Sequence, residues 1–236
     1  MLNRCKRVQK FSLEFIKGIK NLLFTPACLL CQEPLIKTDF KTFCEECQNH
    51  FEWIDYQNKL ETCAGISVCP YIRKLLTTFS YQGSAEALLT AFKVNKRSDL
   101  SQVMGALMVL QWLKAGLPLP DFLVPAPSSP LANYKRGFSP SLLLAESIGK
   151  LLNRPVWSGL KAEVSFIKQS QKTKQERLKL SEDHFYLSKS YQILKDKHIV
   201  LVDDIITTGH TLHLASSVLL EVLPKQIDAL SFARAD

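Results

Sequence analysis

The chain has 236 residues, of which 46% are hydrophobic and 22% are charged, and its formal net charge is +8. These values are ordinary for a soluble globular protein, and a chain of this length can bury a core without disulfides. No apolar run approaches the roughly 18–20 residues that a membrane span needs, and we see no secretory signal. The seven cysteines include pairs at metal-ligand spacing, so we expect a cytoplasmic protein in a reducing compartment.

The positive charge is concentrated in two segments. Residues 1–20 contain six Lys or Arg against one Glu, and residues 161–180 contain six against two Glu. The rest of the chain is close to neutral. This distribution favours anionic partners near these two segments.

Residues 8–23 have the pattern of an amphipathic helix, and we treat residues 1–23 as a basic helical segment. Val8, Phe11, Phe15 and Ile19 form one apolar stripe with lysines opposite. The helix can dock on its own protein, or it can meet a membrane surface or a partner. The sequence leaves these alternatives open.

Residues 24–60 contain two Cys-x2-Cys pairs separated by twelve residues, Cys28 with Cys31 and Cys44 with Cys47. A Cys-x2-Cys turn aims two thiolates at one point, and two such turns complete a tetrahedral zinc site. The alternative is four free buried cysteines. A four-sulfur site has no open coordination position, so we predict a structural zinc ribbon.

Residues 61–236 alternate between strand and helix patterns, with strands expected near 64–71, 75–83, 121–127, 199–202 and 226–235 and helices near 84–94, 99–116, 139–153 and 211–223. Such alternation predicts a parallel sheet covered by helices on both faces, in one large domain.

The stretch HIVLVDDIITTGHTL, residues 198–212, contains the strongest chemical signal. We expect Asp203 and Asp204 to emerge, facing solvent, where a buried strand ends, since ligands bind at the carboxyl ends of parallel strands. The Thr-rich turn 207–211 then leads into a helix N-terminus, which suits a phosphate, and Gly209 allows close approach. Acids beside a phosphate site predict a site that binds a sugar phosphate, with the carboxylates on the sugar hydroxyls. The alternative is an ordinary loop with an Asp cap.

This stretch closely resembles the 5-phosphoribosyl-1-pyrophosphate (PRPP) signature of type I phosphoribosyltransferases. Further motifs narrow the resemblance to the ComF/GntX family of competence-associated proteins. They are the four-cysteine pattern, SYQG with Lys93 downstream, VPAP at 124–127, RGF at 136–138, Gln169 eight residues before Arg177, and Phe185. The resemblance implies a type I phosphoribosyltransferase-like α/β fold, a parallel sheet flanked by helices, with a small N-terminal zinc ribbon.

The resemblance also implies the site residues and cofactors. The PRPP-binding set is Asp203, Asp204, Ile205, Ile206, Thr207, Thr208, Gly209, His210, Thr211 and Ser128. Mg²⁺ would accompany the pyrophosphate. Residues 165–180 are placed to form a basic loop over it, with Lys168 and Arg177 as catalytic candidates.

Single-stranded DNA and DNA-uptake proteins are the partners that the resemblance implies. Lysines and aromatic side chains suited to a single strand occur together, and the candidates are Tyr134, Lys135, Arg136, Phe138, Lys172 and Lys174. The segment 166–179 can equally be a solvated loop.

Three functions stay open. The chain can be a PRPP-binding protein of DNA uptake, an active phosphoribosyltransferase, or a PRPP sensor without turnover. Relatives usually continue RGF with Asn-Gln, whereas Ser139 and Pro140 follow here, so the region facing a second substrate is altered.

Overall fold

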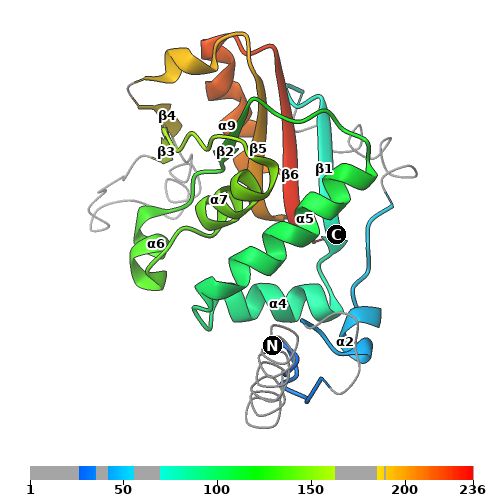
Figure 1. Ribbon diagram of the computed structural model, residues 1–236. Coiled ribbons are helices and arrows are strands. Elements are labelled where there is room, and N and C mark those ends of the chain that lie inside the picture. The colour runs from blue at the N-terminus through cyan, green and yellow to red at the C-terminus, as the bar shows by residue number, and fades with distance from the viewer. Residues whose placement is uncertain (1–26, 36–41, 56–69, 163–184, 189, 236) are drawn as a thin grey trace, which may run out of the picture. The chain divides into compact units, whose positions relative to one another are not determined.

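The computed structural model describes residues 27–35, 42–55, 70–162, 185–188 and 190–235 (Figure 1). The predicted helix 8–23, most of the predicted strand 64–71 and the candidates Lys168, Lys172, Lys174 and Arg177 lie outside these ranges. Contacts divide the chain into two units, Met1–Phe51 and Glu52–Asp236. Each unit is described by itself.

Within residues 27–35 and 42–51 of the first unit, regular structure is limited to one bridge and one short helix. Ala27 and Pro34 form an antiparallel bridge, and helix α2 spans Glu45–Asn49 with Cys44 as its N-cap. Phe43 and Phe51 pack edge to face with ring centroids 5.1 Å apart. Such a small apolar core is a weak source of stability, so cross-linking by a metal would add to it substantially.

The second unit contains the predicted parallel sheet. Its strands are β1 (Lys74–Ser80), β2 (Phe122–Pro125), β5 (His198–Ile206) and β6 (Gln226–Arg234), in the order β1-β6-β5-β2 (Figure 1). All three strand pairings are parallel. The central strands β5 and β6 are buried along nearly their whole length, as their runs of Val, Ile, Leu and Ala predict.

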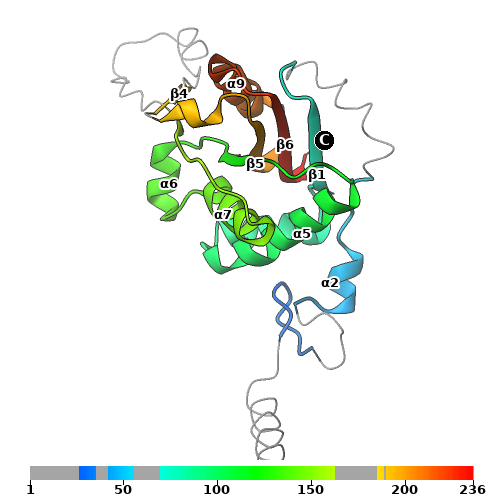
Figure 2. The same cartoon turned by 45° about the horizontal axis from the view of Figure 1, so that its top comes forward.

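Helices cover both faces of this sheet. The longer helices of this unit are α4 (Gly83–Lys93), α5 (Ser101–Lys114), α7 (Pro140–Leu152) and α9 (His210–Leu219). In Figure 2 the sheet lies between α9 on one face and α5 with α7 on the other. Short 3-10 turns at Ser98–Leu100 and Leu220–Val222 account for the longer helices predicted at 99–116 and 211–223. The predicted helix positions are therefore confirmed.

Three short elements were not predicted. Helix α6 spans Pro130–Arg136, and strands β3 (Leu160–Ala162) and β4 (Phe185–Leu187) pair antiparallel. Helix α6 begins with proline in its first turn and ends at Gly137, whose φ of 90° stops the helix. A 3-10 turn at Tyr191–Leu194 precedes β5. None of the helices that the structure describes is both long and apolar enough to cross a membrane.

Candidate functional site

The acid pair lies inside strand β5 rather than beyond its end. We expected Asp203 and Asp204 to face solvent, but they are only 8% and 6% exposed. The expectation was wrong because β5 stays paired with β6 past the acids, to Ile206 opposite Arg234. A polar residue does not end a strand whose backbone still has a partner. The acids nevertheless lie near the carboxyl end of the strand, where ligands of parallel sheets bind.

Asp203 is held by neighbours on two elements. Its Oδ1 accepts a hydrogen bond from the Ser141 hydroxyl of α7 at 3.2 Å and another from the Asp204 N–H at 2.8 Å. Burial, together with the negative charge of Asp204, raises the pKa of Asp203 to about 7. Near neutral pH Asp203 is therefore partly protonated.

Asp204 forms an ion pair with the last residue of α4. The Lys93 Nζ lies 3.0 Å from Asp204 Oδ2, with side-chain exposures of 27% and 9%. The lysine cancels one of the two negative charges that the strand brings together. An anionic ligand therefore meets less repulsion here than two adjacent carboxylates would produce.

The loop after β5 has the geometry of a phosphate site. Thr207 and Thr208 are exposed, and Gly209 is the N-cap of α9 with φ of 77°. Gly209 has no side chain to accept from the first-turn N–H groups of α9, and the Thr208 hydroxyl accepts from one of them, the His210 N–H, at 3.4 Å. These N–H groups and the helix dipole favour an anion. This arrangement fits the phosphate-binding role predicted for residues 207–211.

A cavity of about 440 Å³ lies at the carboxyl end of β2. Hydroxyl and amide groups share its wall, and the Ser128 hydroxyl lies 2.9 Å from Asn133 Oδ1 and 3.4 Å from the Ser139 hydroxyl. Lys161 and Tyr186, from β3 and β4, line the other side. Ala126, which also lines the cavity, donates its N–H to the Val202 carbonyl of β5. The predicted ligand-binding residue Ser128 thus lines this cavity, whereas Asp203 and Asp204 are not among its lining residues.

The segment 134–138 divides into exposed and packed residues. Tyr134 is 85% exposed and Lys135 is exposed beside it. Arg136 instead donates from Nε to the Lys93 carbonyl at 3.2 Å, and the Phe138 ring packs on Phe92 at 5.2 Å. Of the four candidates for DNA contact in this segment, only Tyr134 and Lys135 project into solvent.

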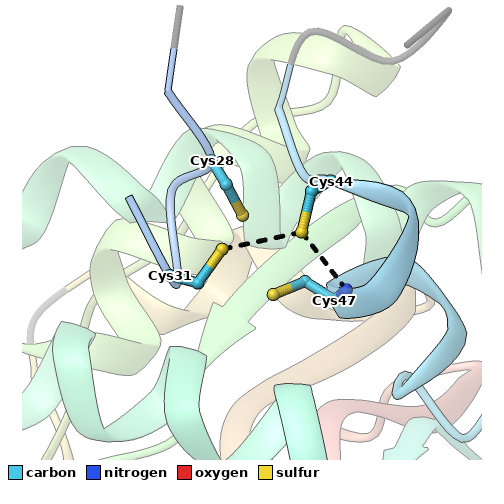
Figure 3. Close-up of side chains that lie close together, drawn as sticks. All are labelled: Cys28, Cys31, Cys44 and Cys47. Atoms are coloured by element: carbon cyan, nitrogen blue, oxygen red, sulfur yellow. Dashed lines mark hydrogen bonds between the residues drawn. The ribbon is translucent and has the colours of Figure 1, made fainter. Parts of the chain in front are cut away.

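The four predicted metal ligands converge in the first unit (Figure 3). The sulfurs of Cys28, Cys31, Cys44 and Cys47 all lie within 4.8 Å of one another, and those of Cys31 and Cys44 are 3.6 Å apart. Tetrahedral bonds of about 2.3 Å to a zinc ion would put sulfurs about 3.8 Å apart. The cluster therefore fits one four-coordinate metal ion.

The thiols of this cluster are electrostatically unequal. Burial opposes ionisation of Cys28, but hydrogen bonds from the Cys31, Cys44 and Leu30 N–H groups outweigh it and lower its pKa to about 6. Burial and the neighbouring thiols raise the pKa of Cys47. Ionisation of one thiol thus opposes ionisation of the neighbouring thiols. A divalent cation relieves that repulsion and allows all four sulfurs to ionise.

Sequence reasoning missed two residues that contact the acids, Lys93 and Ser141. Lys93 was noted only as part of a motif, and no local pattern indicated that its ammonium group reaches Asp204. Ser141 follows Pro140 at the start of α7 and reads as an ordinary first-turn residue. No local pattern indicated that it faces a strand 62 residues away.

Comparison with known proteins agrees with this geometry. Residues 146–235 match the phosphoribosyl transferase domain family. Competence protein ComFC of Bacillus subtilis is 34% identical over 153 residues, a match that covers 64% of this chain and 54% of ComFC. Competence protein F of Haemophilus influenzae is 24% identical over 199 residues, 82% of this chain and 85% of that protein. The chain is therefore similar to competence proteins of the ComF family and contains a region that matches the phosphoribosyl transferase domain.

Further relatives carry a DNA-related name. The DNA utilization protein YhgH of Escherichia coli K12 is 27% identical over 158 residues, covering 64% of this chain and 67% of YhgH. The chain spans about half the length of ComFC, so the match concerns only that part of the relative.

Solved structures with some likeness are phosphoribosyltransferases. A purine phosphoribosyltransferase from Pyrococcus horikoshii has 18% identity and a TM-score of 0.34, covering 54% of this chain and 69% of that chain. A glutamine PRPP amidotransferase from Bacillus subtilis has 14% identity and a TM-score of 0.36, covering 62% and 27%.

Proposed function

We propose that this protein binds PRPP at the carboxyl edge of its sheet and acts in DNA uptake or utilization, in contact with single-stranded DNA. The observation that supports the proposal most is that the acid pair of β5 is followed, after a short Thr-rich loop, by the N-terminus of α9. Phosphate suits the helix N-terminus, and the vicinal hydroxyls of ribose suit carboxylate acceptors. The competence and DNA utilization names of the relatives supply the cellular context.

In this proposal each part of the ligand has its own place. The 5′-phosphate is bound by residues 207–211, and the ribose hydroxyls donate to Asp204 and Asp203. The pyrophosphate, with its Mg²⁺, extends toward the cavity lined by Ser128 and Ser139. The basic residues Lys168 and Arg177, which lie outside the described residues, stay predicted to close over it.

We further propose that the four cysteines hold structural zinc. Four thiolates fill a tetrahedral coordination shell, so the ion has no open position for a substrate. Its role is to cross-link two turns that bury little apolar surface. The catalytic chemistry, if any, belongs to the second unit.

For DNA contact, Tyr134 and Lys135 are the favoured pair among the described residues. An exposed tyrosine can stack on an unpaired base, and the neighbouring lysine can neutralise a phosphate. Lys172 and Lys174 stay predicted to add further phosphate contacts.

The 440 Å³ cavity supports a second candidate function, phosphoribosyl transfer to a small acceptor. It is within the size range of small-molecule sites, and Tyr186 offers a ring for a planar acceptor to stack on. In such a reaction the acids orient the ribose, and the bond from ribose C1 to the pyrophosphate breaks.

One experiment separates the two. The protein is incubated with PRPP and Mg²⁺, pyrophosphate release is followed with and without candidate bases, and single-strand DNA binding is measured in parallel. DNA binding and PRPP binding without release support the DNA-uptake proposal. Release that depends on one base supports the transferase. Absence of PRPP binding contradicts both.

A further inference from the structure

We propose that Lys93 is a positioning residue that keeps Asp204 in its anionic form beside Asp203, so that the acid pair presents a fixed carboxylate to the ribose. This inference rests on the proposed PRPP binding. It assigns a function to a side chain that does not belong to the PRPP signature. The proposal starts from the 3.0 Å ion pair between Lys93 Nζ and Asp204 Oδ2.

The surrounding contacts hold Lys93 in place from its backbone side. Lys93 ends helix α4, where its carbonyl oxygen accepts a hydrogen bond from Arg136 Nε at 3.2 Å. The adjacent Phe92 is fully buried and packs on Phe138. The RGF segment therefore fixes the helix end from which the ammonium group reaches the acids. This gives Arg136 and Phe138 a structural reason to occur together.

The charges around the acids explain why such a residue is needed. The groups facing the pair are Lys93 from α4, the neutral Ser141 hydroxyl from α7, and the acids themselves from β5. Burial and the charge of Asp204 favour protonation of Asp203, whereas the charge of Lys93 opposes it. Without the lysine, two buried neighbouring carboxylates would share protons up to a higher pH.

The ion pair also lowers the electrostatic barrier to the ligand. Asp204⁻ with Lys93⁺ is neutral, so the polyanionic PRPP does not approach an uncompensated negative charge. A lysine that is 27% exposed keeps contact with solvent, so it can shift along its flexible stem as a sugar enters.

The first test needs no ligand. Carbon-13 spectra of the aspartate carboxyl groups are titrated with pH in the wild type, in Lys93→Met and in Lys93→Arg. Lys225→Met is the matched control, because it removes the same charge from an exposed site just before β6, at the opposite end of the strands. We expect the midpoint of the Asp203–Asp204 pair to move to higher pH in Lys93→Met only. Unchanged midpoints in Lys93→Met would overturn the proposal.

The second test measures PRPP binding with Mg²⁺ by calorimetry across pH 6 to 9. Loss of the charge-assisted contact that fixes Asp204 predicts about tenfold weaker binding at pH 7 for Lys93→Met. Lys93→Arg should stay within about threefold of wild type. Equal affinities and pH profiles in Lys93→Met and Lys225→Met would overturn the proposal. If the wild type itself binds no PRPP, the proposed function fails, whereas the carboxyl titration still decides whether Lys93 sets the ionisation of the acids.

Discussion

Asp203 is a buried carboxyl group of β5 that accepts hydrogen bonds from the Ser141 hydroxyl and from the Asp204 N–H. The sequence indicated two acids next to a phosphate-type loop, and the structure confirms that they lie together near the carboxyl end of β5. Their burial could not be predicted, because it depends on pairing with β6 and on cover from α7. The same burial raises the pKa of Asp203, which gives the site a proton equilibrium near neutrality.

This equilibrium predicts a pH-dependent stability. Because folding raises the pKa of Asp203 from 3.8 to about 7, its contribution to stability is fully present below about pH 4 and is lost as pH rises through about 7. In the wild type, Asp203 should make the free energy of unfolding decline between pH 4 and 7. In Asp203→Asn this contribution to the decline should be absent. Urea unfolding of both proteins at several pH values measures it. A stability difference that stays constant over this window would contradict the raised pKa.

A second prediction at this scale concerns Tyr134 and Lys135. Binding of single-stranded DNA should weaken in Tyr134→Ala without a change in salt dependence, because stacking releases no counterions. Lys135→Ala should flatten the slope of log affinity against log salt by about 0.7, the value for one phosphate contact. Titrations at four salt concentrations check both, with Lys225→Ala as control. Slopes and affinities equal to wild type in both variants would move DNA contact away from α6.

At the scale of elements, long periodic segments were predictable and short ones were not. Helices α5 and α7 and strands β5 and β6 follow from apolar patterns that are long enough to be unambiguous. Helix α6 has seven residues and no apolar stripe of its own, since Leu131 and Tyr134 are exposed. Strands β3 and β4 have three residues each and exist through their mutual pairing. Such elements depend on tertiary context, which no local pattern contains.

The packing of α5 on α7 predicts that replacing Gly105 by alanine lowers stability, although such a change in a helix usually raises it. Helix propensity alone favours Gly105→Ala by about 1 kcal/mol. However, an added Cβ would lie 2.5 Å from the Ser147 hydroxyl oxygen and 2.8 Å from Ser147 Cβ. Overpacking of this kind costs about 1–3 kcal/mol, so we expect Gly105→Ala to destabilise the protein.

The partner variant tests the cause. In a Ser147→Gly background the clash is gone, so Gly105→Ala should become neutral or stabilising in denaturant unfolding. Destabilisation of equal size in both backgrounds would show that contact with Ser147 is not the reason.

The cysteine cluster gives the second prediction at this scale. Cys44→Ser should lose the metal while the second unit keeps its cooperative unfolding. Serine is a favoured N-cap residue, so the substitution should not destabilise α2 through loss of its N-cap. Metal analysis of protein purified without chelator, alongside Cys5→Ser as a cysteine outside the pairs, checks it. One zinc per chain in Cys44→Ser, or none in the wild type, would contradict the ribbon.

For the whole molecule, the sequence supports the family, the parallel sheet and the metal cluster more firmly than the ligand. The PRPP signature and the cysteine spacing each lie within a short stretch of sequence, so both can be identified without knowing the fold. The contacts that prepare the acids are not local, since Lys93 and Ser141 come from helices that end or begin far from β5 in the chain. The fold therefore places the Lys93 ammonium group and the Ser141 hydroxyl beside the acids, and neither group is part of the PRPP motif.

The central claim is that the acid pair binds the ribose hydroxyls of PRPP. One calorimetric comparison tests this claim most directly. PRPP with Mg²⁺ is titrated into the wild type and into Asp203→Asn/Asp204→Asn, which preserves side-chain volume at these buried positions. Each lost charge-assisted bond is worth about 1.5–3 kcal/mol, so affinity should fall by about two orders of magnitude or more. Thermal unfolding confirms that the variant is folded. A folded variant that binds PRPP with wild-type affinity would contradict the account.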